Sequence, residues 1–109
     1  MATRTLASPP LAEREAVLRS IRQHETALRA LGVARLWLFG SLARAEARGG
    51  SDVDDMIGVL RGRKFSLFDL SEVRVELCEL LDREVDVVIE DDLMPEFRSE
   101  IAPDLVRVF

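Results

Sequence analysis

Apolar residues recur every three or four positions in the first third of the chain, the spacing that puts side chains on one face of a helix. They are Leu11, Val17, Leu18, Ile21, Leu28 and Leu31. Ser8 is a residue type that caps helix N-termini, and Pro9 and Pro10 suit the first helical positions. Gly32 suits the position just after a helix end. We therefore expect one amphipathic helix between Ser8 and Gly32.

Three short segments have the composition of β-strands: residues 35–39, 52–60 and 84–89. Helix-favouring residues 42–47 follow the first of them, and residues 65–83 return to helical spacing before the third. A further short helix is expected to begin near Pro95 and to end before Pro103, because proline cannot continue the helical hydrogen-bond ladder. The conformation of the apolar residues 105–109 stays open.

Helices that interleave with at least three strands predict an α+β fold, a two-layer arrangement in which helices cover one face of a small mixed sheet. The chain has 109 residues, with no repeat, linker or low-complexity segment. A single domain over residues 1–109 follows from that length. Apolar residues make up 48% and charged residues 32% of the chain, which is typical of a globular protein rather than a disordered one.

The net charge is −5, and lysine and arginine form no basic block. Direct nucleic-acid binding is therefore not expected, whereas a basic protein or a metal-neutralised nucleotide fits the charge. The chain has no apolar run that could span a bilayer and no secretory signal in residues 1–10, so the expected location is the cytoplasm. The single cysteine, Cys78, lies in an apolar helical run and is interpreted as a small core residue.

Gly40 and Ser41 stand where the first predicted strand meets the following helix. The first turn of a helix leaves backbone N–H groups without intrahelical partners, and the helix dipole adds positive potential there. Such a turn suits the terminal phosphates of a nucleoside triphosphate. Asp52 and Asp54 follow after ten intervening residues. Their spacing of two puts both carboxylates on the same face of the predicted strand.

Three aspartates are candidate metal ligands. Two close carboxylates repel each other unless a cation lies between them, and hard oxygen ligands favour Mg²⁺. Asp86 lies in the third predicted strand, between two valines. If that strand pairs beside the second one, Asp52, Asp54 and Asp86 form a three-carboxylate cluster that can hold two metal ions.

Residues 38–44 (LFGSLAR), 51–54 (SDVD) and 85–88 (VDVV) resemble the minimal nucleotidyltransferase family of the DNA polymerase β superfamily. The similarity extends to the leading helix and to the helix between the strands, so it covers most of the chain. The resemblance implies a polymerase-β-type nucleotidyltransferase fold. It also implies transfer of a nucleoside monophosphate, AMP from ATP, to a hydroxyl group, with Mg²⁺ or alternatively Mn²⁺.

Bacterial members of this family are often encoded beside a HEPN-domain protein, as the antitoxin of a toxin–antitoxin pair. Some neutralise the partner by transferring AMP to it, typically onto a tyrosine. The resemblance therefore implies an antitoxin that acts on a HEPN toxin. Because this chain contains no tyrosine, an acceptor tyrosine has to belong to another molecule.

The resemblance also implies roles for individual residues. Gly40 and Ser41 would bind the β- and γ-phosphates of the triphosphate. Asp52 and Asp54 would ligate the metals, and Asp86 would ligate the catalytic metal and help to deprotonate the acceptor hydroxyl. Arg44 resembles the family's arginine after the Gly-Ser turn, which would screen phosphate charge. The alternative, given equal weight, is that Arg44 is a helix residue that faces the solvent.

Two positions depart from the family pattern. Asp55 stands where a bulky aliphatic residue is usual, and strand periodicity points it away from Asp52 and Asp54, toward the helix layer. A buried carboxylate there has to be paired, protonated or near a sheet edge. Ala45 stands where glycine is common; because alanine disfavours a positive φ, we expect the turn to be displaced toward residues 49–50.

Two other functions stay open at this point. One is a small-molecule nucleotidyltransferase of the aminoglycoside-modifying type, whose acceptor surface a partner chain would have to supply. The other is a catalytically silent antitoxin that blocks its partner by contact, which the residues at positions 45 and 55 favour and the intact Gly-Ser turn and aspartates oppose. The choice between homo- and hetero-oligomer is also open.

Overall fold

Four strands form one sheet in this computed structural model, which describes residues 9–47 and 52–109. The strands are β1 (Val33–Phe39), β2 (Val53–Val59), β3 (Val85–Ile89) and β4 (Val106–Arg107). Their order is β3-β2-β1-β4. β1 is antiparallel to both β2 and β4, whereas β2 and β3 are parallel. The three predicted strands are confirmed, and part of the segment left open, residues 105–109, forms the fourth.

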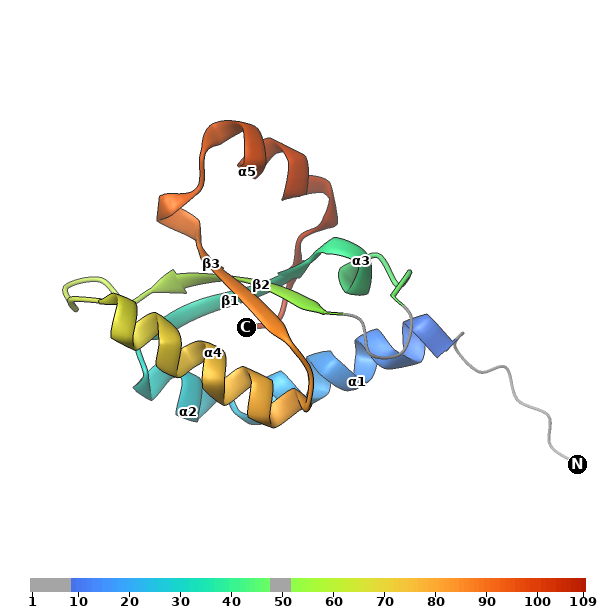
Figure 1. The fold of residues 1–109 in the computed structure, drawn as a ribbon, viewed down its shortest axis with the longest axis horizontal. Helices are drawn as coiled ribbons and strands as arrows, with labels where there is room; N and C mark the ends of the chain where they lie inside the picture. Colours follow the sequence, from blue (N-terminus) through green and yellow to red (C-terminus); the bar gives the residue numbers. More distant parts are fainter. Residues whose placement is uncertain (1–8, 48–51) are drawn as a thin grey trace, which may run out of the picture.

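Three helices cover one face of this sheet: α1 (Pro9–Gln23), α2 (Glu25–Ala30) and α4 (Leu67–Leu81) (Figure 1). The main core lies between them and the strands. Its fully buried side chains include Ile21, Leu28, Leu36, Leu38, Ile57, Val73 and Leu77. Alternate residues of β1 and β2 point into this core. There they pack against the apolar faces of the three helices.

The opposite face carries α5 (Pro95–Ile101), which stands on the far side of the strands from α4 in Figure 1. It packs over a smaller core whose buried members are Phe39, Met56 and Ile101. The α+β class is confirmed, but the expectation that helices cover only one face is wrong. The reason is that Trp37 and Phe39 of β1 and Met56 of β2 make part of the second face apolar, and that part needs cover as well.

Two predicted helices have different limits. The first helix is interrupted at His24, where α1 ends and α2 begins, although the core positions on either side, Ile21 and Leu28, keep a common face. Its C-terminal glycine is confirmed, since Gly32 has φ +110°. The predicted capping residue Ser8 lies outside the described residues. The helix expected over residues 42–47 is the shorter α3 (Gly40–Ala43).

The helix predicted over residues 65–83 is confirmed as α4. Ser66 caps it: its hydroxyl accepts a hydrogen bond from the Asp69 N–H while the Asp69 carboxylate accepts one from the Ser66 N–H. The limits expected for the last helix are also confirmed. Residues 90–92 form a 3₁₀ turn before α5, whose N-cap is Met94. Within the described ranges every helix is too short or too polar to traverse a bilayer.

Candidate functional site

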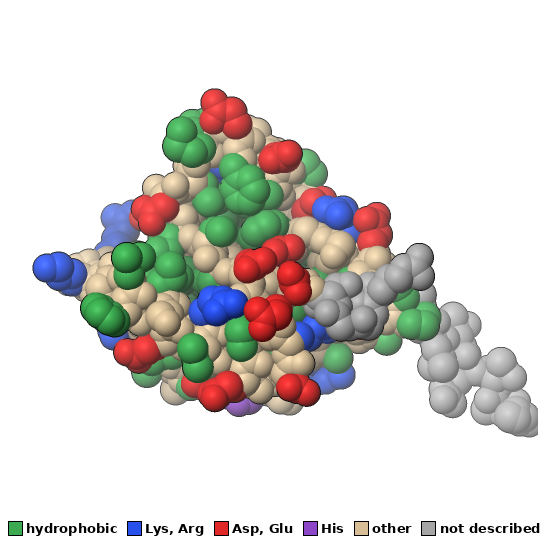
Figure 2. Space-filling view, in the orientation of Figure 1, with side chains coloured by type: hydrophobic (Ala, Val, Ile, Leu, Met, Phe, Trp, Pro, Cys, Tyr) green, Lys and Arg blue, Asp and Glu red, His purple; other side chains and the backbone are tan. Residues whose placement is uncertain are grey.

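The strand pairing brings two of the predicted site aspartates side by side. Asp54 of β2 pairs with Asp86 of β3, one residue into each of the two parallel strands. Asp52 directly precedes β2 and is exposed, as is Asp86, whereas Asp54 is half-buried. Asp52 and Asp54 are separated from Met56 by an even number of residues, and Asp86 is paired with Asp54. All three therefore lie on the face that carries Met56 and α5. Figure 2 shows acidic side chains gathered there, beside the hydrophobic side chains under α5.

The turn at Gly40 lies against Asp54. Phe39, the last residue of β1, pairs with Asp54, and the chain then turns into α3 with φ +77° at Gly40. A Cβ atom at Gly40 would overlap the Asp54 Oδ2 atom. Glycine is therefore required twice, for its positive φ and for the close approach of the carboxylate. The first turn of α3, with Ser41, consequently begins beside the aspartates.

Arg44 ends α3 and is held by two carboxylates. Its guanidinium lies 2.9 Å from Glu46 Oε1 and 2.7 Å from Asp104 Oδ2. These hydrogen bonds, to Glu46 first and then to Asp104, raise the pKa of Arg44. Its positive charge also partly offsets the rise in the pKa of Asp54 that burial and the neighbouring carboxylates cause. Arg44 is therefore exposed and held next to the aspartates; a role in screening phosphate charge stays a prediction.

The reason for expecting a displaced turn does not hold, because Ala45 itself adopts φ +59°; residues 49–50, toward which the turn was expected to move, lie outside the described residues. An alanine in this left-handed conformation costs about 1 kcal/mol relative to glycine. The Ala45 N–H donates to the Leu42 carbonyl at 3.0 Å and the Glu46 N–H donates to the Ser41 carbonyl at 2.9 Å, which closes the end of α3. The tertiary fold therefore imposes the turn at the family position despite the missing glycine.

The negative charges of the aspartates at this site repel each other. Burial raises the pKa of Asp54, and the neighbouring carboxylates of Asp86 and Asp52 raise it further. Within residues 9–47 and 52–109 no three His, Cys, Asp or Glu side chains converge closely enough to form a complete metal centre. The donors are nevertheless carboxylate oxygens, the type that Mg²⁺ prefers, and a cation would remove the repulsion among them. The aspartates therefore fit a divalent cation by donor chemistry and charge.

Asp55 points into the opposite, main core. Its side chain is fully buried, and within the described part of the chain neither carboxylate oxygen has a hydrogen-bond partner. β2 is an inner strand, so a position at the sheet edge is excluded. Burial, and secondly the charge of Asp54, raise the pKa of Asp55 well above its ordinary value. Of the three expectations, paired, protonated or at an edge, protonation is the one that agrees with the structure.

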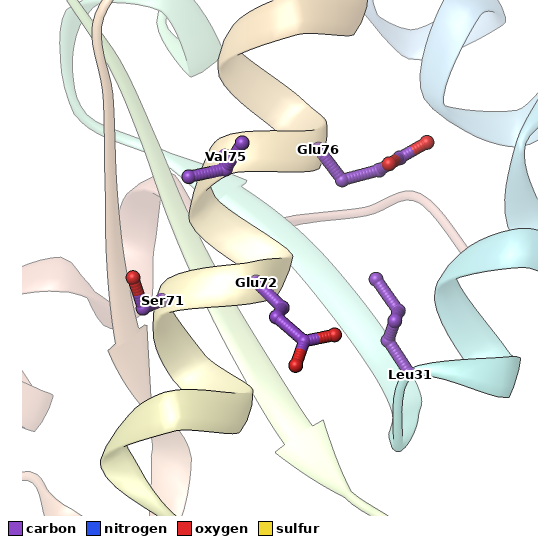
Figure 3. A pocket seen from close by; sticks show the side chains of 5 residues that line it. All are labelled: Leu31, Ser71, Glu72, Val75 and Glu76. Carbon is purple, nitrogen blue, oxygen red and sulfur yellow. The ribbon is translucent and has the colours of Figure 1, made fainter.

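Sequence reasoning did not identify Asp104, which reaches the site from the 3₁₀ turn after α5 (Ala102–Asp104). It lies 60 positions from Arg44 along the chain, and no local pattern signals such a contact. The hollow drawn in Figure 3 is a different feature, since its lining residues come from α4 and from the end of α2. It is lined by Leu31, Ser71, Glu72, Val75 and Glu76.

Comparison with known proteins gives a consistent result. Residues 21–108 match the family described as nucleotidyltransferase domain. A protein of Methanocaldococcus jannaschii, named as a candidate protein adenylyltransferase, is 38% identical over 77 residues, which cover 71% of this chain and 81% of that protein.

Two solved structures have the same fold. One is described as a candidate minimal nucleotidyltransferase; it is 32% identical, has a TM-score of 0.63, and is matched over 82% of this chain and 93% of its own. The other is the complex of a tri-AMPylated Shewanella oneidensis HEPN toxin with an MNT antitoxin. Its match has a TM-score of 0.61 at 16% identity and covers 84% of this chain and 71% of that one. At that identity the likeness bears on the fold alone.

Proposed function

The chain belongs to the nucleotidyltransferase domain family and is a nucleotidyltransferase; from this premise we propose that it transfers AMP from ATP to a hydroxyl of a HEPN toxin. In this role it acts as the antitoxin of that partner. The observation that carries the proposal is the pairing of Asp54 with Asp86 beside the turn at Gly40. It puts two carboxylates next to a helix start, as transfer from a metal-bound triphosphate requires.

Asp52, Asp54 and Asp86 would hold the divalent metal, Mg²⁺ or Mn²⁺. When bound, the metal neutralises triphosphate charge and makes the acceptor hydroxyl easier to deprotonate. The raised pKa of Asp54 supports this assignment, because burial and two neighbouring negative charges leave its ionised form poorly stabilised without a cation. Asp86 is the exposed member of the paired aspartates, so it is accessible to accept the proton of the incoming hydroxyl.

The first turn of α3 binds the terminal phosphates. The N–H groups of Ser41 and its neighbours lie in the turn where a helix has no intrahelical acceptors for them. Gly40 lets this turn approach Asp54 closely, so the phosphates and the metal ligands share one site. Arg44 adds a fixed positive charge near Asp54. The acceptor oxygen attacks the α-phosphorus, and the P–O bond to pyrophosphate breaks.

The acceptor hydroxyl belongs to a partner. Because the chain has no tyrosine, it cannot supply the residue that members of this family modify. A relative is named as a candidate protein adenylyltransferase, and a neighbour of the same fold is described together with an AMPylated HEPN toxin. The first name supports a protein as the acceptor here, and the second supports a HEPN toxin as that protein.

The test is intact-mass spectrometry of the HEPN partner after incubation with this chain, ATP and Mg²⁺. We expect mass increments of one or more AMP units. The variants Asp52→Asn/Asp54→Asn and Asp86→Asn should give none. Asp91→Asn serves as the matched control, because it alters an exposed aspartate outside the site and should leave the increments unchanged.

A growth assay tests the antitoxin role separately. Co-expression of the wild-type chain should relieve the toxicity of the HEPN protein, whereas the Asp86→Asn variant should not. An unmodified partner in the presence of the folded chain, ATP and Mg²⁺ would contradict the transfer. Relief of toxicity by the Asp86→Asn variant would contradict the catalytic basis of the antitoxin role and favour neutralisation by contact.

A further inference from the structure

The outward side of α4 exposes large apolar side chains. Leu67 and Phe68 in its first turn are each 82% exposed, and Val75 is 49% exposed. The opposite side of the same helix is buried through Val73 and Leu77. Hydrophobic side chains accordingly appear along α4 in Figure 2. Apolar residues that share one exposed helix face mark an interaction surface.

Charge is distributed unevenly along this surface. The loop before α4 carries three exposed basic residues, Arg61, Arg63 and Lys64. The C-terminal end of the helix carries the exposed acidic residues Glu79 and Asp82. Positions 68, 75, 79 and 82 follow helical spacing on the outward side. The surface is therefore basic at one end, apolar in the middle and acidic at the other end.

One flank of this outward surface of α4 is acidic. Figure 3 shows Glu72 projecting toward Leu31 and Glu76 projecting from the same side of α4, whereas Ser71 and Val75 project from the other side. These five residues line the shallow hollow beside the helix. The small Ser71 lies midway between Phe68 and Val75 along the chain, where a second helix can approach closely.

We propose that two copies of this chain associate through α4, packed antiparallel about a twofold axis near Ser71. In this register Phe68 packs on Val75 of the second copy. The same antiparallel arrangement brings the loop that carries Arg61 and Lys64 to the end of the second copy's helix that carries Glu79 and Asp82. Because a twofold axis repeats every contact, the same surface of α4 supplies both sides of the interface.

The charge order favours a second copy as the occupant. A stripe that is uniformly acidic would fit a basic partner, but this one carries its own complementary basic segment at the opposite end. Antiparallel pairing is the orientation that brings the two ends together, whereas parallel pairing would oppose like charges. The paired aspartates lie on the sheet face that carries α5, whereas α4 covers the opposite face. Association through the outward side of α4 therefore leaves the candidate sites uncovered.

Sedimentation equilibrium of the chain alone, without nucleotide or toxin, tests the association independently of the proposed function. We expect the average mass to rise with concentration from 12.3 kDa toward twice that value. Phe68→Asp should hold the mass at the monomer value. The Glu79→Lys variant should weaken association by about tenfold or more, and Lys64→Glu/Glu79→Lys should restore it because the charges are exchanged. Glu100→Lys, an exposed site on α5, should have no effect.

Cross-linking provides a second readout. Ser71→Cys in a Cys78→Ala background should form a disulfide-linked dimer under mild oxidation, whereas Glu100→Cys in the same background should not. Circular dichroism checks that each variant is folded. A wild-type chain that stays monomeric at all concentrations would overturn the proposal. A dimer that is insensitive to Phe68→Asp and to the charge exchange would overturn it as well.

Discussion

Replacing the buried Asp55 with valine is expected to stabilise the fold. The carboxyl group is fully buried and without a hydrogen-bond partner among the described residues. A buried polar group in that state costs about 1–3 kcal/mol. Valine restores an aliphatic side chain to an inner strand whose neighbouring strand positions are Leu38 and Val87. We therefore expect Asp55→Val to raise the free energy of unfolding by about 1–3 kcal/mol at acidic pH.

The gain should increase with pH. Because burial raises the pKa of Asp55 in the folded chain, the folded state binds the proton more tightly than the unfolded state. The stability that the protonated Asp55 contributes is fully present below the ordinary pKa of about 3.9, and it is lost as the pH rises toward the folded-state pKa. The slope in that window is about 1.4 kcal/mol per pH unit. The valine variant lacks this loss, so its advantage widens from acidic to neutral pH.

Urea unfolding followed by circular dichroism at several pH values measures both effects. Asp55→Asn is the matched control: it keeps the size of the side chain and cannot ionise, so it should abolish the pH slope without the gain from apolar burial. A constant difference between wild type and Asp55→Val across pH 5 to 8, or a destabilised valine variant, would refute the reasoning that the carboxyl group is buried and protonated.

Three further outcomes can be measured. Gly40→Ala should lower the free energy of unfolding by about 1–3 kcal/mol and reduce AMP transfer, because the new Cβ meets Asp54 at a positive φ; unchanged urea midpoint and rate would contradict this. Ala45→Gly should raise the urea midpoint, by about 0.5–1 kcal/mol of stability, since φ is +59° there; a lower midpoint would oppose it. Because the pKa of Asp54 is raised above that of an ordinary aspartate, the Mg²⁺ affinity measured by calorimetry should fall as the pH is lowered and protons compete with the metal; an affinity that is unchanged from neutral pH down to about 4 would speak against Asp54 as a ligand.

Much of the fold follows from periodicity. Strand alternation around Val53 and Ile57, and helical spacing through Val73 and Leu77, identify the faces that meet in the main core. What periodicity does not reveal is where a short helix packs. Residues 95–101 were predicted to be helical, but only tertiary structure brings Phe97 against Phe39 on the second sheet face, with ring centroids 5.9 Å apart.

The site divides in the same way. The spacing of Asp52 and Asp54 implies a shared face, and the parallel register then aligns Asp86 with Asp54. That register depends on the βαβ connection through α4. The sequence predicts the helix, whereas the parallel pairing of β3 beside β2 is seen only in the structure. The contact between Arg44 and Asp104 could not be predicted, because it depends on how the segment after α5 returns to the sheet. The positive φ of Ala45 contradicts local propensity for the same reason: the packed chain imposes it.

Adjacent aspartates in one strand show how position decides what a carboxyl group can do. Asp54 and Asp55 are neighbours, so alternation sends one to the face of α5 and the other into the main core. Asp54 has other carboxylates beside it, and a cation can stabilise its ionised form. Burial raises the pKa of Asp55, and no cation can reach its carboxylate in the main core. Asp55 is therefore neutral only when it keeps its proton. The first residue therefore suits phosphoryl-transfer chemistry, whereas the second lowers the stability of the strand that carries it.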